Sequence, residues 1–307
     1  MSQVLRRWSS EREGWSEASS DLPKTSPFRG GIESVGFALA DGIGRLTTEN
    51  PRLDAEVLLA HAMGVPRSWL VAHIETELTP KERERFFEYV DQVAAGVPLP
   101  YVLGRWEFFK LGFKVDPRVL IPRPETELMV ETALAWAKTQ HTPRIVDVGT
   151  GSGCVAITLA VNAPAAVITA TDVSAEALSL ARENALEHAV ADRIQFAAGD
   201  GLLPAGSVDL ICCNPPYVAT GELDALPSAL HEPRLALDGG PDGLTVIRPV
   251  IQAAPRHLLP DGVLLMEIGA SQREAVLELA RAAFPHAQGI RVLKDLAGLD
   301  RLLVVQS

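Results

Sequence analysis

The amino-acid sequence predicts an α/β protein in which a doubly wound sheet of seven strands follows a small helical bundle, with a β-hairpin joining the two. Three observations predict this fold. From residue 144 onward, short apolar β-prone runs alternate with helical patterns, as in a mostly parallel sheet. A glycine-rich turn follows the first of these runs. Before residue 100, apolar residues recur at helical spacing.

The length of 307 residues predicts more than one domain. Residues 1–30 are rich in Ser, Glu and Arg and lack apolar periodicity, so we expect a mobile extension there. We assign residues 31–100 to a helical substrate-recognition module, 101–123 to a hairpin linker and 124–307 to the α/β domain. The apolar fraction of 47% is that of a soluble globular protein.

The charge and the cysteines exclude several classes of function. A formal net charge of −11 at pH 7 argues against stable binding to nucleic acid, which needs a basic face. The three cysteines have no Cys-x-x-Cys spacing, and the seven histidines form no pair four residues apart. We therefore expect no metal site, no disulfide and a cytoplasmic location. No apolar run has the length of a membrane span, and no apolar signal segment follows Arg6 and Arg7.

The pattern of residues 32–97 is helical. Pro51 suits a first helical turn and Gly64 a helix end. Thr79 is a predicted N-cap directly before Pro80. The helix that begins there is expected to bury Phe86, Phe87, Val90 and Val93.

An aromatic stretch connects the bundle to the α/β domain. Lys110-Leu111-Gly112 lies between two β-prone runs, which predicts a hairpin that turns there. We interpret the aromatic side chains as core between the domains. The loop Ile-Pro-Arg-Pro-Glu-Thr-Glu at 121–127 then leads into a helix expected to end near residue 140, and its acids favour the helix N-terminus through the helix dipole.

The elements that follow indicate a Rossmann-like sheet. The expected strands are 144–148, 167–171, 193–198, 208–213, 263–268, 290–294 and 301–305. Helices are expected at 154–162, after the N-cap Ser174, and at 271–284. The last two strands complete seven, and the sequence leaves open whether that pair is antiparallel.

The glycine-rich turn after the first strand favours S-adenosylmethionine over other nucleotides. No Gly-Lys-Ser/Thr follows, which excludes a P-loop, and the third glycine comes one residue too early for a dinucleotide fingerprint. A carboxylate just before the turn repels a pyrophosphate but attracts the ammonium and sulfonium groups of S-adenosylmethionine, and glycines let the backbone approach. The expected contacts in this turn are Asp147, Gly149, Thr150, Gly151, Ser152 and Gly153.

Acids also end the next two strands. Asp172 is placed to accept hydrogen bonds from both ribose hydroxyls. Asp200, with the backbone of Gly201, is placed to meet the adenine amino group. Three successive strands that end in an acid or a glycine loop predict an S-adenosylmethionine site, and Asn214 after the fourth strand is expected to border it.

The fourth strand ends in Asn-Pro-Pro-Tyr. Two prolines end a strand because neither donates a ladder hydrogen bond and each fixes φ. Ligands of open α/β sheets lie beyond the carboxyl ends of the strands, where this tetrapeptide falls. The residues predicted to bind the methyl acceptor are Asn214, Pro215, Pro216 and Tyr217.

Four motifs together resemble the HemK family of protein-(glutamine-N5) methyltransferases. They are the turn at 147–153, Asn-Pro-Pro-Tyr at 214–217, Ile-Pro-Arg-Pro-Glu-Thr-Glu at 121–127 and Ala-Leu-Asp-Gly-Gly-Pro-Asp-Gly-Leu at 236–244. The resemblance covers roughly residues 32–305. It implies methyl transfer from S-adenosylmethionine to the glutamine of the Gly-Gly-Gln motif in class I peptide chain release factors, which tunes translation termination.

The chemistry of a glutamine amide agrees with this resemblance. Its nitrogen is a poor nucleophile, so the site must align it with the sulfonium methyl group and accept both of its N–H groups. We expect the Asn214 side-chain oxygen and the Pro215 carbonyl to accept them, and Tyr217 to pack on the amide plane. These three residues are the predicted catalytic set, acting by orientation and desolvation. Arg123 and Glu125 are expected at the entrance, although Glu125 equally suits helix capping.

Three alternatives stay open. An adenine-N6 methyltransferase of DNA or RNA would act on a similar planar NH₂ group, and those of DNA share Asn-Pro-Pro-Tyr. Such an enzyme must flip a base and bind phosphates, which the acidic net charge opposes. A glutamine methyltransferase for a ribosomal protein differs mainly in the N-terminal module. A non-catalytic cofactor-binding scaffold is opposed by the intact tetrapeptide.

Overall fold

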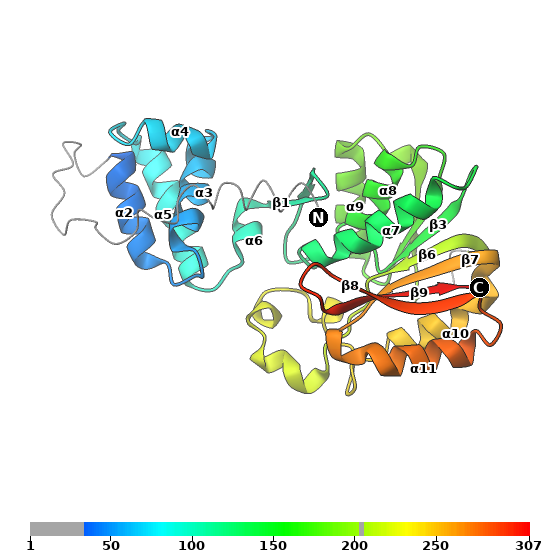
Figure 1. Cartoon of the computed structure of the whole chain (residues 1–307). Coiled ribbons are helices and arrows are strands. Elements are labelled where there is room, and N and C mark those ends of the chain that lie inside the picture. Colours follow the sequence, from blue (N-terminus) through cyan, green and yellow to red (C-terminus); the bar gives the residue numbers. More distant parts are fainter. Residues whose placement is uncertain (1–33, 203–205) are drawn as a thin grey trace. The chain divides into compact units, whose positions relative to one another are not determined.

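The computed structural model describes residues 34–202 and 206–307, so the expectation for residues 1–30 lies outside the described residues. The described chain divides into two compact units, of which the first ends at Gly104 and the second is Arg105–Ser307. Figure 1 shows a helical first unit and an α/β second unit.

The first unit is a bundle of short helices. They are α2 (Val35–Arg45), α3 (Pro51–Met63), α4 (Arg67–Ala72), α5 (Pro80–Ala94) and α6 (Leu99–Leu103). The predicted helix ends are confirmed, because Gly64 ends α3 in the left-handed conformation and Thr79 forms a capping box with Glu82 at the start of α5. Phe86 is fully buried, whereas Phe87 is only partly buried beneath the guanidinium of Arg45, 4.4 Å from its ring centre. Phe87 therefore packs at the edge of the buried face, against the core, rather than within it.

The second unit begins with the predicted hairpin, but its turn lies elsewhere. Strand β1 (Arg105–Phe108) pairs antiparallel with β2 (Leu111–Lys114). The turn residues are Phe109 and Lys110, with φ of 50° and 64°, the left-handed conformation that two-residue hairpins require. The Phe109 N–H donates to the Glu127 carboxylate at 2.9 Å, and this contact from outside the hairpin holds the turn where the sequence has no glycine.

The sheet of the second unit has the seven strands that the sequence predicts. They are β3 (Arg144–Val148), β4 (Val167–Asp172), β5 (Ile194–Ala198), β6 (Val208–Cys213), β7 (Leu258–Glu267), β8 (Gly289–Lys294) and β9 (Asp300–Gln306). Their order is β5-β4-β3-β6-β7-β9-β8. Strand β9 pairs antiparallel with both of its neighbours, and the pairs from β5 to β7 are parallel. Strand β9 alone therefore opposes the direction of the others.

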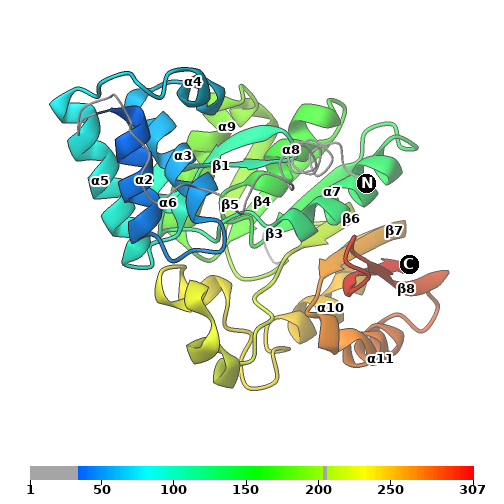
Figure 2. The same ribbon diagram turned by 60° about the vertical axis from the view of Figure 1, so that its left-hand side comes forward.

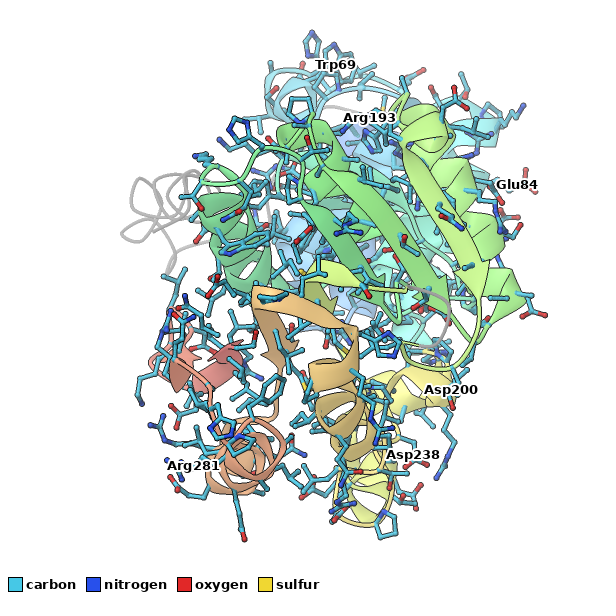
Figure 3. All side chains as sticks on the ribbon, turned by 90° about the vertical axis from the view of Figure 1, so that its right-hand side faces the viewer. Trp69, Glu84, Arg193, Asp200, Asp238 and Arg281 are labelled. Carbon is cyan, nitrogen blue, oxygen red and sulfur yellow. The ribbon has the colours of Figure 1, made fainter. Side chains whose placement is uncertain are left out.

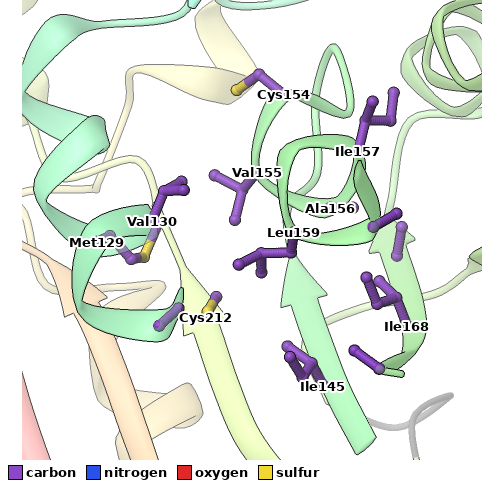
Figure 4. Packing of buried hydrophobic residues seen from close by; sticks show 14 of the residues in the cluster. Met129, Val130, Ile145, Cys154, Val155, Ala156, Ile157, Leu159, Ile168 and Cys212 are labelled. Carbon is purple, nitrogen blue, oxygen red and sulfur yellow. The ribbon is translucent and has the colours of Figure 1, made fainter. Parts of the chain in front are cut away.

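Helices cover both faces of this sheet. Figure 1 and Figure 2 show α7 (Glu127–Ala137), α8 (Cys154–Asn162) and α9 (Ala175–Glu187) on one face, and α10 (Ile247–His257) and α11 (Arg273–Ala283) on the other. Alternate residues of each strand enter opposite cores. In β6, Leu210 packs on the α7 and α8 side and Ile211 on the α10 and α11 side. Figure 4 shows the first of these cores, where side chains of α7 and α8 meet Ile145 and Ile168.

Several boundaries differ from the expected ones, and helix α7 ends at Ala137 rather than near residue 140. Strand β7 begins five residues before the expected start, because the pairing with β6 shifts register between Val208 and Leu210 and so accommodates Pro260 and Gly262. Helix α11 begins at Arg273, after a 3-10 turn over Ala270–Gln272. In the part of the chain that the structure describes, no helix has the length and apolarity needed to cross a membrane.

Candidate active site

A pocket of about 490 Å³ lies beyond the carboxyl ends of strands β3 to β6, a size suited to a small-molecule ligand. All residues predicted to contact the cofactor except Gly153 line it, together with Pro215, Pro216 and Arg123. Glu125 and Tyr217 are not part of its wall. Figure 3 labels two of its acids, Asp200 after β5 and Asp238 in the segment after β6.

The glycine-rich turn is held open by backbone hydrogen bonds. The N–H groups of Gly149 and Thr150 both donate to the Thr171 carbonyl at 2.9 Å. Gly149, Gly151 and Gly153 all have positive φ, a conformation that disfavours side chains. A Cβ on Gly153 would also lie 2.8 Å from the Ile157 side chain of α8, so the turn fits closely against the helix that follows it.

Asp147 is a buried carboxylate beneath this turn. Its Oδ2 accepts hydrogen bonds from the Thr150 hydroxyl at 2.6 Å and the Ala156 N–H at 3.2 Å. Burial raises the pKa of Asp147 to about 6, because an ionised carboxylate is disfavoured away from water. A cationic group bound in the pocket would restore the missing stabilisation, which fits the ammonium of S-adenosylmethionine.

Asp172 anchors the turn and keeps capacity for a ligand. Its two oxygens accept the N–H groups of Gly151 and Ser174, each at 2.9 Å. A carboxylate has about four acceptor positions, so two remain for ribose hydroxyls. Asp200 is exposed at the wall, and the neighbouring Gly201 carbonyl accepts from the Thr171 hydroxyl at 3.2 Å.

Asn214 is held by a hydrogen-bonded chain of buried groups. Its Nδ2 donates to Thr126 Oγ1 at 3.2 Å, and the Thr126 hydroxyl donates to Glu267 Oε2 at 2.6 Å. The Tyr217 hydroxyl donates to the other Glu267 oxygen at 3.3 Å. Burial raises the pKa of Glu267 and that of Tyr217. The tyrosine hydroxyl is thereby engaged with Glu267, and the packing of the Tyr217 ring on a substrate amide stays a prediction.

The glycines of the motif at 236–244 pack against the backbone of the tetrapeptide. A Cβ on Gly239 would lie 2.8 Å from the Pro216 carbonyl oxygen, and one on Gly243 would collide with the Tyr217 carbonyl oxygen. Gln272 Nε2 donates to the carbonyls of Tyr217 and Gly243 at 2.9 and 3.1 Å. The loop at 236–244 and Gln272, in the 3-10 turn before α11, therefore hold the backbone of the tetrapeptide that begins with Asn214.

Arg123 lines the pocket and is paired with a carboxylate that the sequence analysis missed. Its Nη2 lies 2.5 Å from Glu232 Oε1, and Glu232 is 5% exposed. The second Glu232 oxygen accepts from the Ile121 N–H at 3.0 Å. This pair ties the loop at 121–127 to the segment after β6. Glu125 is exposed beside it.

The sequence did not predict two further buried residues of the site, Glu267 and Asn184, although a pattern at the end of β7 indicates the first. Glu267 ends β7 just as Asp172 ends β4, so the rule that found Asp172 applies to it equally. Asn184 of α9 is fully buried and donates to the carbonyls of Ser152 and Lys114 at 2.9 and 3.1 Å. It joins β2 to the glycine-rich turn, and nothing in its sequence surroundings indicates this.

The cysteines and acids offer no metal centre within residues 34–202 and 206–307, where no group of three or more His, Cys, Asp or Glu could hold an ion. Cys154, Cys212 and Cys213 are buried free thiols. Burial raises the pKa of Cys154 to about 12, so this thiol is neutral and a poor nucleophile.

Comparison with known proteins places both units in described families. Residues 38–104 match the family model of the PrmC N-terminal domain. Residues 125–285 match the model of the methyltransferase small domain.

Individual relatives are similar over most of the chain. The release factor glutamine methyltransferase of Moorella thermoacetica is 45% identical over 270 residues, which covers 86% of this chain and 95% of that protein. The protein of the same name from Bordetella pertussis is 41% identical over 259 residues, with 82% and 93% covered. A solved structure, the release factor-specific protein-(glutamine-N5) methyltransferase of Alicyclobacillus acidocaldarius, is 31% identical, with a TM-score of 0.40 and 63% and 98% covered.

Proposed function

The chain belongs to the family of release factor glutamine methyltransferases, and on that premise we propose how it uses its pocket. It transfers the methyl group of S-adenosylmethionine to the side-chain amide nitrogen of the glutamine in the Gly-Gly-Gln motif of class I release factors. One observation supports this most directly. Asn214 borders the pocket with its Nδ2 engaged by Thr126, which leaves its acceptor oxygen for an incoming N–H group.

The residues of the pocket fit S-adenosylmethionine. The buried carboxylate of Asp147 suits a cationic amino group, and the glycines of the turn let the protein backbone approach the ligand closely. Asp172 has acceptor capacity for ribose hydroxyls and Asp200 for the adenine amino group. When bound, S-adenosylmethionine supplies an electrophilic methyl group.

The protein contributes position rather than acid or base catalysis. The amide nitrogen of glutamine is weakly nucleophilic because its lone pair is delocalised into the carbonyl. Asn214 Oδ1 and the Pro215 carbonyl accept its two N–H groups, so the nitrogen faces the methyl group in a fixed direction. Well-aligned positioning lowers a barrier by roughly 7–11 kcal/mol. The proton of the methylated nitrogen leaves after or alongside transfer.

The test is the transfer of labelled methyl from S-adenosylmethionine to a purified class I release factor. The matched control is the same factor with the glutamine of Gly-Gly-Gln changed to alanine. We expect label on the first and none on the second. Equal labelling of both would contradict the assigned target, and labelled DNA or RNA beside unlabelled release factor would establish an adenine methyltransferase instead.

A further inference from the structure

We propose that Thr126 and Glu267 are positioning residues that decide which end of the Asn214 amide faces the pocket. The inference rests on the proposed function, which uses the Asn214 oxygen as the acceptor for the substrate amide. It assigns a task to two buried residues of which one lies in the loop at 121–127 and the other ends β7.

The orientation of Asn214 matters because the two ends of its carboxamide have the same shape and opposite roles. The oxygen accepts hydrogen bonds and the NH₂ group donates them. Turning the amide by 180° would therefore set donor against donor at the substrate nitrogen. The backbone of Asn214, fixed by Pro215 and Pro216, does not prevent that turn. A side-chain partner must prevent it.

Thr126 is that partner, and Glu267 determines how it bonds. A hydroxyl has a single proton to donate. Glu267 Oε2, 2.6 Å from Thr126 Oγ1, is an acceptor only, so the Thr126 proton points at it. Thr126 Oγ1 can then only accept from Asn214, whose Nδ2 lies 3.2 Å away. The NH₂ end of Asn214 must face Thr126, and Oδ1 must face the pocket.

Each oxygen of Glu267 faces a hydroxyl donor. Its side chain is 1% exposed, and its second oxygen accepts the Tyr217 hydroxyl at 3.3 Å. Burial raises the pKa of Glu267, and the charge of Glu125 adds to this, whereas the Thr126 and Tyr217 hydroxyls and the Arg301 guanidinium favour the ionised form. Two hydroxyl donors and the nearby Arg301 cation thus stabilise a carboxylate that is shielded from water.

A purely structural role would look different in experiment. If Thr126 and Glu267 only joined the loop at 121–127 to β7, their loss would lower stability and cofactor affinity together. A positioning role predicts loss of turnover with intact cofactor binding. Thr126→Val has nearly the same shape without the hydroxyl, and Thr126→Ser retains the hydroxyl, so the two form a matched pair.

The kinetic test uses the full chain and a class I release factor. We expect Thr126→Val to lower kcat at least tenfold while the Kd for S-adenosylmethionine stays within twofold, and Thr126→Ser to stay within threefold of wild-type kcat. Glu267→Gln should lower kcat severalfold, because a neutral amide can present either end to Thr126. In the Thr126→Val background, Glu267→Gln should cause no further loss, since Glu267 acts through Thr126. The inference would be overturned if the losses of kcat multiplied in the double variant, or if Thr126→Val and Thr126→Ser lost kcat equally.

A second measurement does not need the release factor. The side-chain NH₂ resonances of Asn214, identified by their absence in Asn214→Ala, report its hydrogen bond in nitrogen–proton correlation spectra. We expect them to shift in Thr126→Val and Thr126→Ala and to stay close to wild type in Thr126→Ser. Unshifted resonances in the Val and Ala variants would overturn the inference even in an active enzyme. A wild-type chain that leaves the release factor unmethylated would instead contradict the proposed function.

Discussion

Asp147 has opposite effects on folding and on binding, because its carboxylate is buried beneath the glycine-rich turn. Its pKa of about 6 exceeds the ordinary value of 3.8. Between these pH values the folded state binds the proton more tightly than the unfolded chain does, so stability of the ligand-free protein falls as pH rises through this window. Above pH 6 the destabilisation is complete and amounts to about 3 kcal/mol.

Asp147→Asn separates the two effects. An amide oxygen in place of Oδ2 still accepts from the Thr150 hydroxyl and the Ala156 N–H, but it carries no charge. We expect the ligand-free variant to be at least as stable as wild type at pH 7.5 and to bind S-adenosylmethionine at least tenfold more weakly. The wild-type Kd should rise below pH 6 and that of the variant should not. Urea unfolding and calorimetric titration measure both quantities, and a less stable variant with unchanged affinity would contradict this account.

Substitutions of Asn214 and of Asp172 should affect different quantities, turnover for the first and cofactor affinity for the second. Asn214→Ala removes the predicted acceptor for the substrate amide, so we expect kcat to fall at least a hundredfold, about 3 kcal/mol, with the Kd for S-adenosylmethionine within fivefold of wild type. Asp172→Ala removes the predicted ribose contacts and the anchor of the Gly151 N–H, so its Kd should rise at least tenfold. Steady-state kinetics and calorimetry distinguish the two, and equal losses of cofactor binding would refute the division of roles.

At the scale of elements, the tetrapeptide after β6 depends on the loop at 236–244, whose Gly243 lies outside the pocket wall. Gly243 and Gly298 both have positive φ, of 71° and 79°. A Cβ on Gly243 meets the Tyr217 carbonyl, whereas a Cβ on Gly298 meets nothing within 4 Å. Alanine substitutions of the two glycines therefore form a matched pair: both strain the backbone, but only the one at Gly243 also produces a steric clash with the tetrapeptide after β6.

Gly298→Ala should lower the free energy of unfolding by roughly 1–2 kcal/mol, the cost of a left-handed alanine, and Gly243→Ala should lower it further because its Cβ also collides with the Tyr217 carbonyl. Only Gly243→Ala should also lower kcat, by tenfold or more, because it displaces the Tyr217 carbonyl. Thermal unfolding and initial rates on the release factor measure the two effects. Equal kcat in both variants would show that the loop tolerates the added methyl group.

The elements that sequence predicts well are those whose cause is local. Thr79 and Ser174 cap the helices that follow them, and prolines end β6 where the sequence places them. The hairpin turn at Phe109 was misplaced because a distant carboxylate, Glu127, stabilises it. The site shows the same division. Acids at strand ends indicate the candidate cofactor pocket. The hydrogen bonds that hold Asn214 join it to Thr126 across 88 positions and Thr126 to Glu267 across 141, and a linear pattern does not record such contacts.

At the scale of the whole molecule, each unit is built around its own hydrophobic core. The cluster in the helical unit uses residues between Val35 and Val93, and both clusters of the α/β unit use residues from Phe108 onward. Every residue of the pocket wall lies between Arg118 and Val250. The fold of the α/β unit and its cofactor site therefore have their determinants within one unit.

A chain of residues 105–307 should accordingly fold and bind S-adenosylmethionine within threefold of the full-length Kd. Its kcat/KM for a whole release factor should fall at least tenfold, mainly through KM, because the helical unit is expected to recognise that protein. A short peptide containing Gly-Gly-Gln is the matched control substrate, since it presents the acceptor amide without the rest of the factor, and both chains should methylate it at similar rates. Calorimetry and methyl-transfer kinetics on the two substrates decide the matter. Equal kcat/KM of the two chains for the whole release factor would remove the recognition role from the helical unit and place it on the α/β unit.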